Sequence, residues 1–126
     1  MNITLKQVAE ALDAQVVTGK DLMNRKVVSA CGSDMMSDVL AYAKDEAVLL
    51  TGLLNVQVIR TGDVSDVAAI VFVRDKHPEP DVVLAAQAKN IPVLYTRCTM
   101  FEACGRLYTL GLRGCSPKDK KAKKES

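Results

Sequence analysis

The sequence predicts a single three-layer α/β/α domain built on a mostly parallel sheet of four to five strands. Four runs rich in β-branched and apolar residues begin at residues 27, 47, 69 and 92, with helical patterns between most of them. Apart from Thr51, the runs at 47–51 and 69–73 are continuously apolar, which is typical of strands covered on both faces. A length of 126 residues suits one such domain.

A helix and a short strand open the chain. Thr4 and Gln7 have the spacing of a capping box, and Leu5, Val8 and Leu12 follow at helical spacing, which predicts a helix over 5–13. A short strand is expected over 14–18, ending at Gly19, and residues 20–26 read as a polar connection.

Strands and helices then alternate. Strands are expected over 27–31, 47–51, 69–73 and 92–96, and helices over 33–43, 81–89 and 99–110. The helix over 33–43 should carry one apolar face, made of Met35, Met36, Val39, Leu40 and Ala43. The last helix starts with a second capping box, Thr99 and Glu102, and should bury Met100, Phe101, Cys104, Leu107 and Tyr108.

The stretch from Asn55 to Gly62 is ambiguous. Its β-branched residues favour a strand that turns at Gly62-Asp63. The repeating pattern instead requires a helical crossover here, because neighbouring parallel strands need one, and Asn55 is a good N-cap for it. We therefore predict a helix over 55–64.

Charge is unevenly distributed. Five of the 17 Lys and Arg residues lie within 115–126, so residues 1–114 are close to neutral. We expect 115–126 to be a disordered, lysine-rich tail outside a folded domain over 1–114. The near-neutral domain argues against nucleic-acid binding. No long charge-free apolar run and no secretory signal are present, so we expect a cytoplasmic protein with no membrane contact.

Cysteine and histidine usage argues against metal and cofactor sites. The four cysteines, at 31, 98, 104 and 115, form no C-x-x-C pair. We expect small, buried, reduced thiols, with an iron–sulfur or zinc site as the alternative. The one histidine, His77, is expected to be a solvated loop residue. No cofactor is predicted.

A candidate ligand site lies where the parallel strands end, because α/β sheets bind ligands beyond the carboxyl ends of their strands. Small polar residues and an arginine follow the four strands: Ser33, Asp34, Thr51, Gly52, Asn55, Arg74 and Thr99. Helix N-termini behind them would favour an anion such as a nucleotide phosphate. Ser33, Asn55 and Thr99 also have a structural explanation as N-caps, and the Asp34/Asp38 pair reads as a solvated helix start rather than a metal site.

The chain carries none of the common catalytic motifs. A phosphate-binding G-x-x-x-x-G-K-[ST] loop, a G-x-G-x-x-G turn and a G-x-S-x-G elbow are all missing from the sequence. We therefore predict no catalytic residues and a non-enzymatic role. A small enzyme with its site at the strand ends, and a nucleic-acid-linked regulator, remain the alternatives.

Several stretches together resemble the DRTGG family, which is similar to the N-terminal domain of HPr kinase/phosphorylase. The resemblance spans Leu5 to Leu112 and is carried by the segments 36–42, 50–61, 69–76 and 99–105. The chain resembles the small stand-alone type of that family. The DRTGG string itself is absent, and Arg60-Thr61-Gly62-Asp63 is a partial match.

This resemblance implies a self-associating α/β/α domain and supports the helix over 55–64. Related domains accompany kinase, phosphotransacetylase or CBS modules and serve regulation or assembly, which implies a regulatory or assembly role and a possible protein partner. No catalytic residue is implied. A homodimer is also expected from the sequence, because five methionines and an apolar last helix could leave apolar surface exposed.

Overall fold

The computed structural model describes residues 3–114. The helices are α1 (Leu5–Leu12), α2 (Met36–Tyr42), α3 (Val56–Val64), α4 (Pro80–Ala88) and α5 (Met100–Leu110), with a short 3₁₀ turn over Lys20–Leu22. The strands are β1 (Ile3–Thr4), β2 (Gln15–Thr18), β3 (Lys26–Val27), β4 (Ser29–Gly32), β5 (Ala47–Thr51), β6 (Ala69–Phe72), β7 (Val93–Tyr95) and β8 (Arg113–Gly114). The lysine-rich tail predicted over 115–126 lies outside the described residues.

The main sheet has six strands in the order β2-β7-β6-β5-β4-β8. Strands β4 to β8 run parallel, and β2 pairs with β7 in the antiparallel sense. The hydroxyl of Thr18, in β2, donates to the carbonyl of Ile91 at 2.8 Å and accepts from the amide of Val93 at 3.0 Å. The mostly parallel α/β fold is confirmed, with six strands rather than four to five, because the two-residue β8 is defined only by its pairing with β4.

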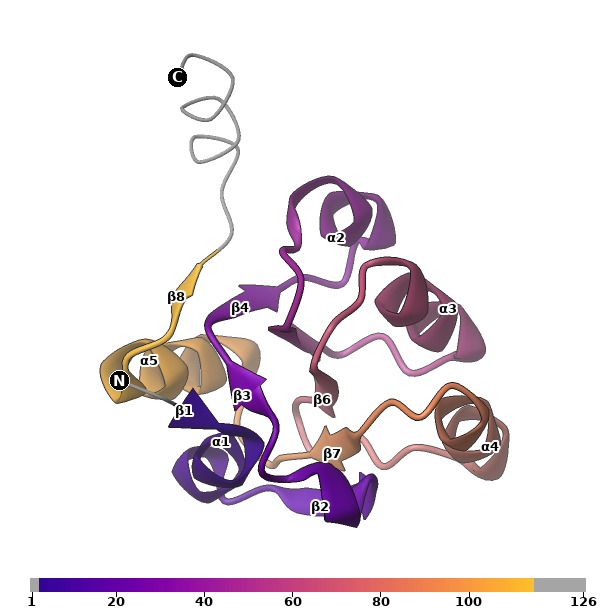
Figure 1. The fold of residues 1–126 in the computed structure, drawn as a ribbon, viewed down its shortest axis with the longest axis horizontal. Coiled ribbons are helices and arrows are strands. Elements are labelled where there is room, and N and C mark those ends of the chain that lie inside the picture. Colours follow the sequence, from indigo (N-terminus) through magenta and orange to yellow (C-terminus); the bar gives the residue numbers. More distant parts are fainter. Residues whose placement is uncertain (1–2, 115–126) are drawn as a thin grey trace.

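The helices cover the two faces of the sheet unequally (Figure 1). Strands β4, β5, β6 and β7 lie side by side in chain order. The crossovers between them place α2, α3 and α4 on one face, as expected when consecutive crossovers have the same hand. After β7 the chain returns across the sheet to β8, so α5 packs on the opposite face beside α1. The three-layer arrangement expected from the sequence is therefore present.

Alternating side chains of the central strands fill two separate cores. In β5, Val48 and Leu50 pack toward α1 and α5, whereas Leu49 packs toward α2, α3 and α4. In β6, Val71 and Phe72 divide in the same way. Every residue of β5 and β6 is buried, which explains why both strands read as continuous apolar runs.

The ambiguous segment is helical, as predicted. Asn55 caps α3, and its side chain accepts from the amide of Val58 at 3.2 Å. Val58 and Ile59 are buried against the sheet, so tertiary packing outweighs the strand propensity of the β-branched residues. Gly62 lets the helix approach β6 closely, because a Cβ there would lie 2.9 Å from Cδ1 of Ile70.

Two predicted helix faces were wrong in detail. Helix α2 begins at Met36 rather than at residue 33, and of its expected apolar face only Val39 is fully buried. In α5 the buried residues are Ala103 and Leu107, while Phe101 and Tyr108 are exposed. The predicted face for α5 was too wide: residues 103 and 107, one turn apart, define the side that touches the sheet.

None of the helices within residues 3–114 has the length and apolar character needed to cross a bilayer.

Candidate functional site

Asp34 organises the polar cluster at the strand ends. It follows β4, and its Oδ1 accepts from the hydroxyl of Thr51 at 3.0 Å and from the amide of Gly52 at 2.7 Å. The Thr51 hydroxyl in turn accepts from the amide of Leu53 at 3.1 Å. The carboxylate therefore links the ends of β4 and β5 and binds donors that an external anion would otherwise use.

Arg74 supplies the positive charge of this cluster. Its guanidinium lies over Gly52, where a Cβ would overlap Nη2. Nη2 is 3.9 Å from Oδ2 of Asp34, and the two side chains are 49% and 55% exposed. This distance is long for a charge-assisted hydrogen bond, and both groups are in contact with solvent, so the pair holds Arg74 only weakly. The guanidinium thus remains able to bind another anion.

The loop after β6 has an unusual backbone that directs Arg74 across the strand ends. Arg74 and Asp75 are consecutive non-glycine residues with positive φ, 64° and 58°. The amide of Arg74 donates to the carbonyl of Cys98, and that of Asp75 to the carbonyl of Thr96, both at 2.8 Å. These two hydrogen bonds offset the cost of the left-handed conformation.

The hydrogen bonds between the loops after β6 and β7 also close the place where a ligand would be expected to bind. The connections after β6 and β7 leave for opposite faces of the sheet, and such a point is where open α/β sheets usually form a binding crevice. Here the loops after the two strands are joined by backbone hydrogen bonds. The polar cluster therefore lies beside this point, at the carboxyl ends of β4, β5 and β6.

The structure brings four of the seven predicted site residues together: Asp34, Thr51, Gly52 and Arg74. Ser33 is not a helix cap; its hydroxyl accepts from the amide of Met35 at 3.0 Å in a turn. Asn55 is next in the chain to this cluster, but its side chain caps α3. Thr99 caps α5, where its side chain accepts from the amide of Glu102 at 3.5 Å.

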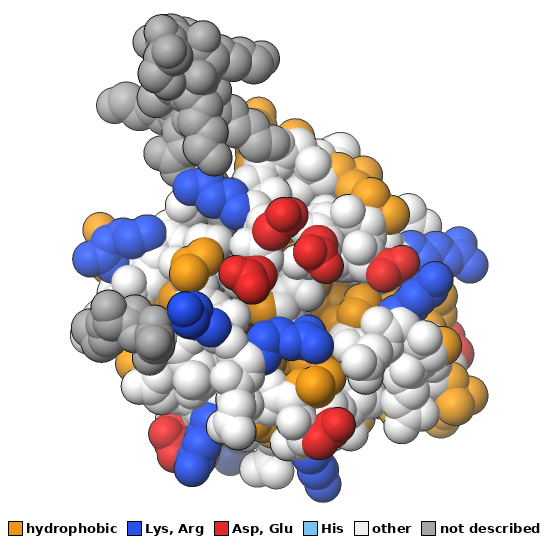
Figure 2. All heavy atoms as spheres, in the orientation of Figure 1, with side chains coloured by type: hydrophobic (Ala, Val, Ile, Leu, Met, Phe, Trp, Pro, Cys, Tyr) orange, Lys and Arg blue, Asp and Glu red, His pale blue; other side chains and the backbone are white. Residues whose placement is uncertain are grey.

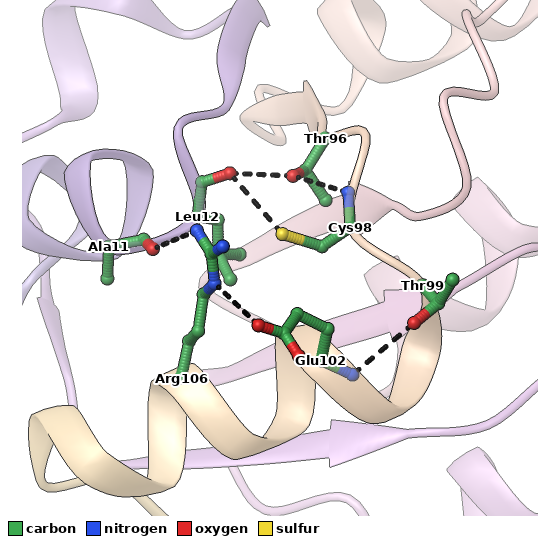
Figure 3. Close-up of polar contacts among 7 residues, drawn as sticks. All are labelled: Ala11, Leu12, Thr96, Cys98, Thr99, Glu102 and Arg106. Atoms are coloured by element: carbon green, nitrogen blue, oxygen red, sulfur yellow. Dashed lines mark hydrogen bonds and ion pairs between the residues drawn. The ribbon is translucent and has the colours of Figure 1, made fainter.

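Thr99 lines a separate hollow of about 410 Å³ together with Arg97 and Arg106. The Glu102 side chain does not complete the predicted capping box; it accepts from Nε of Arg106 at 3.5 Å. Figure 3 shows the Arg106 guanidinium between this carboxylate and the carbonyl of Ala11, to which it donates at 3.3 Å. Arg106 was missed from the sequence, although its i,i+4 spacing from Glu102 was a usable signal.

Thr96 and Cys98 fasten the end of α1 to the loop before α5 (Figure 3). The buried Thr96 hydroxyl donates to the carbonyl of Leu12 at 2.7 Å and accepts from the amide of Cys98 at 3.2 Å. The Cys98 thiol donates a weak bond to the same Leu12 carbonyl at 3.8 Å. These donors and acceptors are satisfied internally, so this cluster has a structural role.

His77 is exposed in a loop, as predicted, but it is not isolated from other side chains. Its Nε2 lies 2.8 Å from the Asp75 carboxylate. Its ring lies 4.1 Å from the ring of Tyr95, measured between centroids. Both contacts place His77 against the loop after β6 and the end of β7.

No disulfide bond joins cysteines within residues 3–114. Cys31, Cys98 and Cys104 are half-buried, and Cys115 lies outside the described residues. Burial raises the pKa of the Cys104 thiol above its ordinary value. Between residues 3 and 114, no three His, Cys, Asp or Glu side chains are grouped closely enough to hold a metal ion.

The surface charge is mixed rather than uniformly basic. On the face shown in Figure 2, acidic side chains gather near the middle and Lys and Arg side chains lie around them. An acidic and basic hollow of about 310 Å³ is lined by Arg25, Glu46, Asp63, Asp66 and Lys89, with an ion pair of 3.5 Å between Lys89 and Asp63. This hollow is made by the segments that precede β5, β6 and β7.

Known proteins with a similar structure and a matching family model support this fold. The chain is similar in structure to the CBS and DRTGG domains of the regulatory region of Clostridium perfringens pyrophosphatase, complexed with the activator diadenosine tetraphosphate. The match has a TM-score of 0.63 at 15% sequence identity and covers 80% of this chain but 44% of the other. No curated protein matches the sequence. The model of the DRTGG domain matches residues 7–110, and the chain therefore belongs to the DRTGG domain family.

Proposed function

We propose that this domain is a non-enzymatic regulatory module, and that its strand-end cluster binds an anionic ligand such as a nucleotide phosphate. Membership of the DRTGG family supports a regulatory role. The similar clostridial region was solved with a nucleotide activator, which supports the choice of ligand class. That region is more than twice as long as the matched part, so its ligand is a guide for testing and not a property of this chain.

The main support for the proposal is the position of Arg74. Its half-exposed guanidinium lies across the ends of the parallel strands, over a glycine that leaves room for it. Arginine forks onto phosphate oxygens with two parallel hydrogen bonds. The first turn of α3 starts nearby at Val56, and the Asn55 side chain caps one of its amides, that of Val58. The positive end of this helix adds to the attraction for an anion.

Phosphate binding at Arg74 would also change the contacts of Asp34. A phosphate that pairs with Arg74 competes with the Asp34 carboxylate for the same guanidinium and for the amide of Gly52. Displacing this carboxylate releases the hydrogen bonds that join the segment after β4 to Thr51 and Gly52. Ligand binding is thereby linked to the conformation of the β4–α2 connection, which a regulatory domain can pass on to a partner.

Calorimetric titration tests the proposal with inorganic phosphate, AMP, ATP and diadenosine tetraphosphate. Arg74→Ala should weaken binding by about 10- to 150-fold, the equivalent of the roughly 1.5–3 kcal/mol of a hydrogen bond to a charged group. Arg60→Ala is the matched control, because Arg60 is an exposed arginine on α3 that takes no part in the hydrogen bonds and the ion pair of the cluster. If none of the four compounds binds below millimolar concentration, the cluster has only a structural role.

We also propose that the domain forms a homodimer. Support comes from large apolar side chains that remain exposed on the folded chain, among them Phe101, Leu84 and Val64. Sedimentation velocity over a range of concentrations should show a dimer; a monomer at every concentration would exclude self-association.

A further inference from the structure

The outer face of α5 combines an exposed aromatic side chain with a hollow. Phe101 is 87% exposed and Tyr108 is 61% exposed, and both lie on the same side of the helix as Gly105, at i, i+4 and i+7 spacing. Beside Phe101 is an open hollow of about 680 Å³, lined also by Ala11, Gly105, Thr109 and Leu110. We call this surface the α5 face.

Gly105 forms the floor of that hollow. Apart from the helix's own backbone and the two neighbouring residues, no atom of residues 3–114 lies within 4 Å of the position that a Cβ would occupy there. Glycine in the middle of a helix is less stable than alanine, and among the described residues no close packing requires a glycine here. The missing side chain leaves a depression one helical turn from the protruding Phe101.

A protrusion and a depression on one helix face are complementary to a second copy of the same face. In an antiparallel pairing of two α5 helices about a two-fold axis near Gly105, residue 101 of one copy lies opposite residue 109 of the other. Phe101 would then enter the hollow lined by Gly105, Thr109 and Leu110 of the second copy. Each copy contributes one protruding ring and receives one.

The charges on the α5 face are compatible with this pairing. Glu102 and Arg106 are paired with each other at 3.5 Å, so the face has no excess of either sign near the hollow. Arg113 lies over the ring of Tyr108, 4.1 Å from its centroid, and its Nη1 donates to the Tyr108 carbonyl. Two identical faces therefore approach without strong like-charge repulsion.

We infer that the α5 face is the homodimer interface, with Phe101 of each copy seated in the hollow beside Gly105 and Thr109 of the other; this inference rests on the proposed self-association. The full chain and its Phe101→Glu variant should be compared by sedimentation velocity. The substitution places a charge at the centre of the interface in both copies, so the dimer dissociation constant should rise by at least about 30-fold, as for a hot-spot residue.

Leu84→Glu is the matched control, because Leu84 is 65% exposed on α4, on the opposite face of the sheet. This variant should dimerise as the wild type does. Both substitutions replace exposed side chains, so circular dichroism should show an unchanged helical content. A Phe101→Glu variant that still dimerises would overturn the assignment of the α5 face while leaving self-association intact. A monomeric wild type would overturn both and would leave the face to another occupant.

Discussion

Replacing Asp34 by asparagine should make the domain bind phosphate more tightly while hardly changing its stability. The amide oxygen of asparagine can still accept from the Thr51 hydroxyl and the Gly52 amide, which Asp34 now binds at 3.0 and 2.7 Å. Only the negative charge is lost. The pair with Arg74 is 3.9 Å long and half exposed, so its loss should lower the free energy of unfolding by less than about 1 kcal/mol.

The gain in affinity follows from the removed repulsion. A single charge acts on another at 4 Å with about 1 kcal/mol in water, and a phosphate at neutral pH carries between one and two charges. Asp34→Asn should therefore tighten phosphate binding by about 5- to 30-fold. Calorimetric titration at constant ionic strength measures this change, and urea unfolding measures the stability of the same samples.

Asp66→Asn provides the control, since Asp66 is an exposed aspartate in the loop that precedes β6, at the other end of the buried strands. It should leave phosphate affinity unchanged within about twofold, because the charge is more than a Debye length from the cluster. Weaker binding by Asp34→Asn, or an equal gain in both variants, would refute the idea that the Asp34 carboxylate stands where the ligand anion binds.

Three further predictions concern packing and titration. Gly62→Ala should lower the free energy of unfolding by about 1–3 kcal/mol, because the added methyl group overpacks against β6. Gly105→Ala should raise the free energy of unfolding by about 0.5–1 kcal/mol, because alanine is the better helix former and its methyl group meets open space. Urea unfolding measures both, with Phe101→Glu added to each protein so that dimerisation does not contribute. Thr96→Val keeps the shape but leaves the Leu12 carbonyl with only the weak bond from the Cys98 thiol and leaves the half-buried Cys98 amide unpaired. The free energy of unfolding should therefore fall by about 1–3 kcal/mol, whereas Thr96→Ser should cost less than half of that. Burial raises the pKa of the Cys104 thiol in the folded protein, so the contribution of this thiol to stability is complete below the ordinary thiol pKa and is lost as the pH rises through the pKa of the folded state. Alkylation of Cys104 by iodoacetamide, followed by mass spectrometry at a series of pH values, should therefore have its midpoint at a higher pH in the folded protein than in urea.

The elements of the fold could be predicted because local signals and burial agree for most of the chain. The capping box of Thr4 and Gln7 and the cap by Asn55 are both present in the structure. The continuous apolar runs of β5 and β6 identified the two most buried strands. Strand β8 could not be predicted, because two residues carry no periodic pattern and its existence depends on pairing with Ser29 and Ala30.

The site was predictable in composition but not in geometry. Residues that follow parallel strands must lie at one end of the sheet, which placed Asp34, Thr51, Gly52 and Arg74 together. Which face each connection then takes depends on the strand order, and that is a tertiary property. Thr99 lies on the α5 side for this reason. The left-handed backbone of Arg74 also left no trace in the sequence, because neither Arg74 nor Asp75 is glycine.

The pairing of β2 with β7 has a consequence for how the chain folds during synthesis. The Thr18 hydroxyl closes on Ile91 and Val93, residues more than 70 positions later. The first strand of the sheet therefore has no partner until β7 has left the ribosome, although α1 can form earlier with its own capping box. The consecutive order of β4, β5, β6 and β7 allows the central strands to assemble one after another in the meantime. Nascent chains that stop before residue 91 should then show a growing sheet with one edge still open to pairing with other chains.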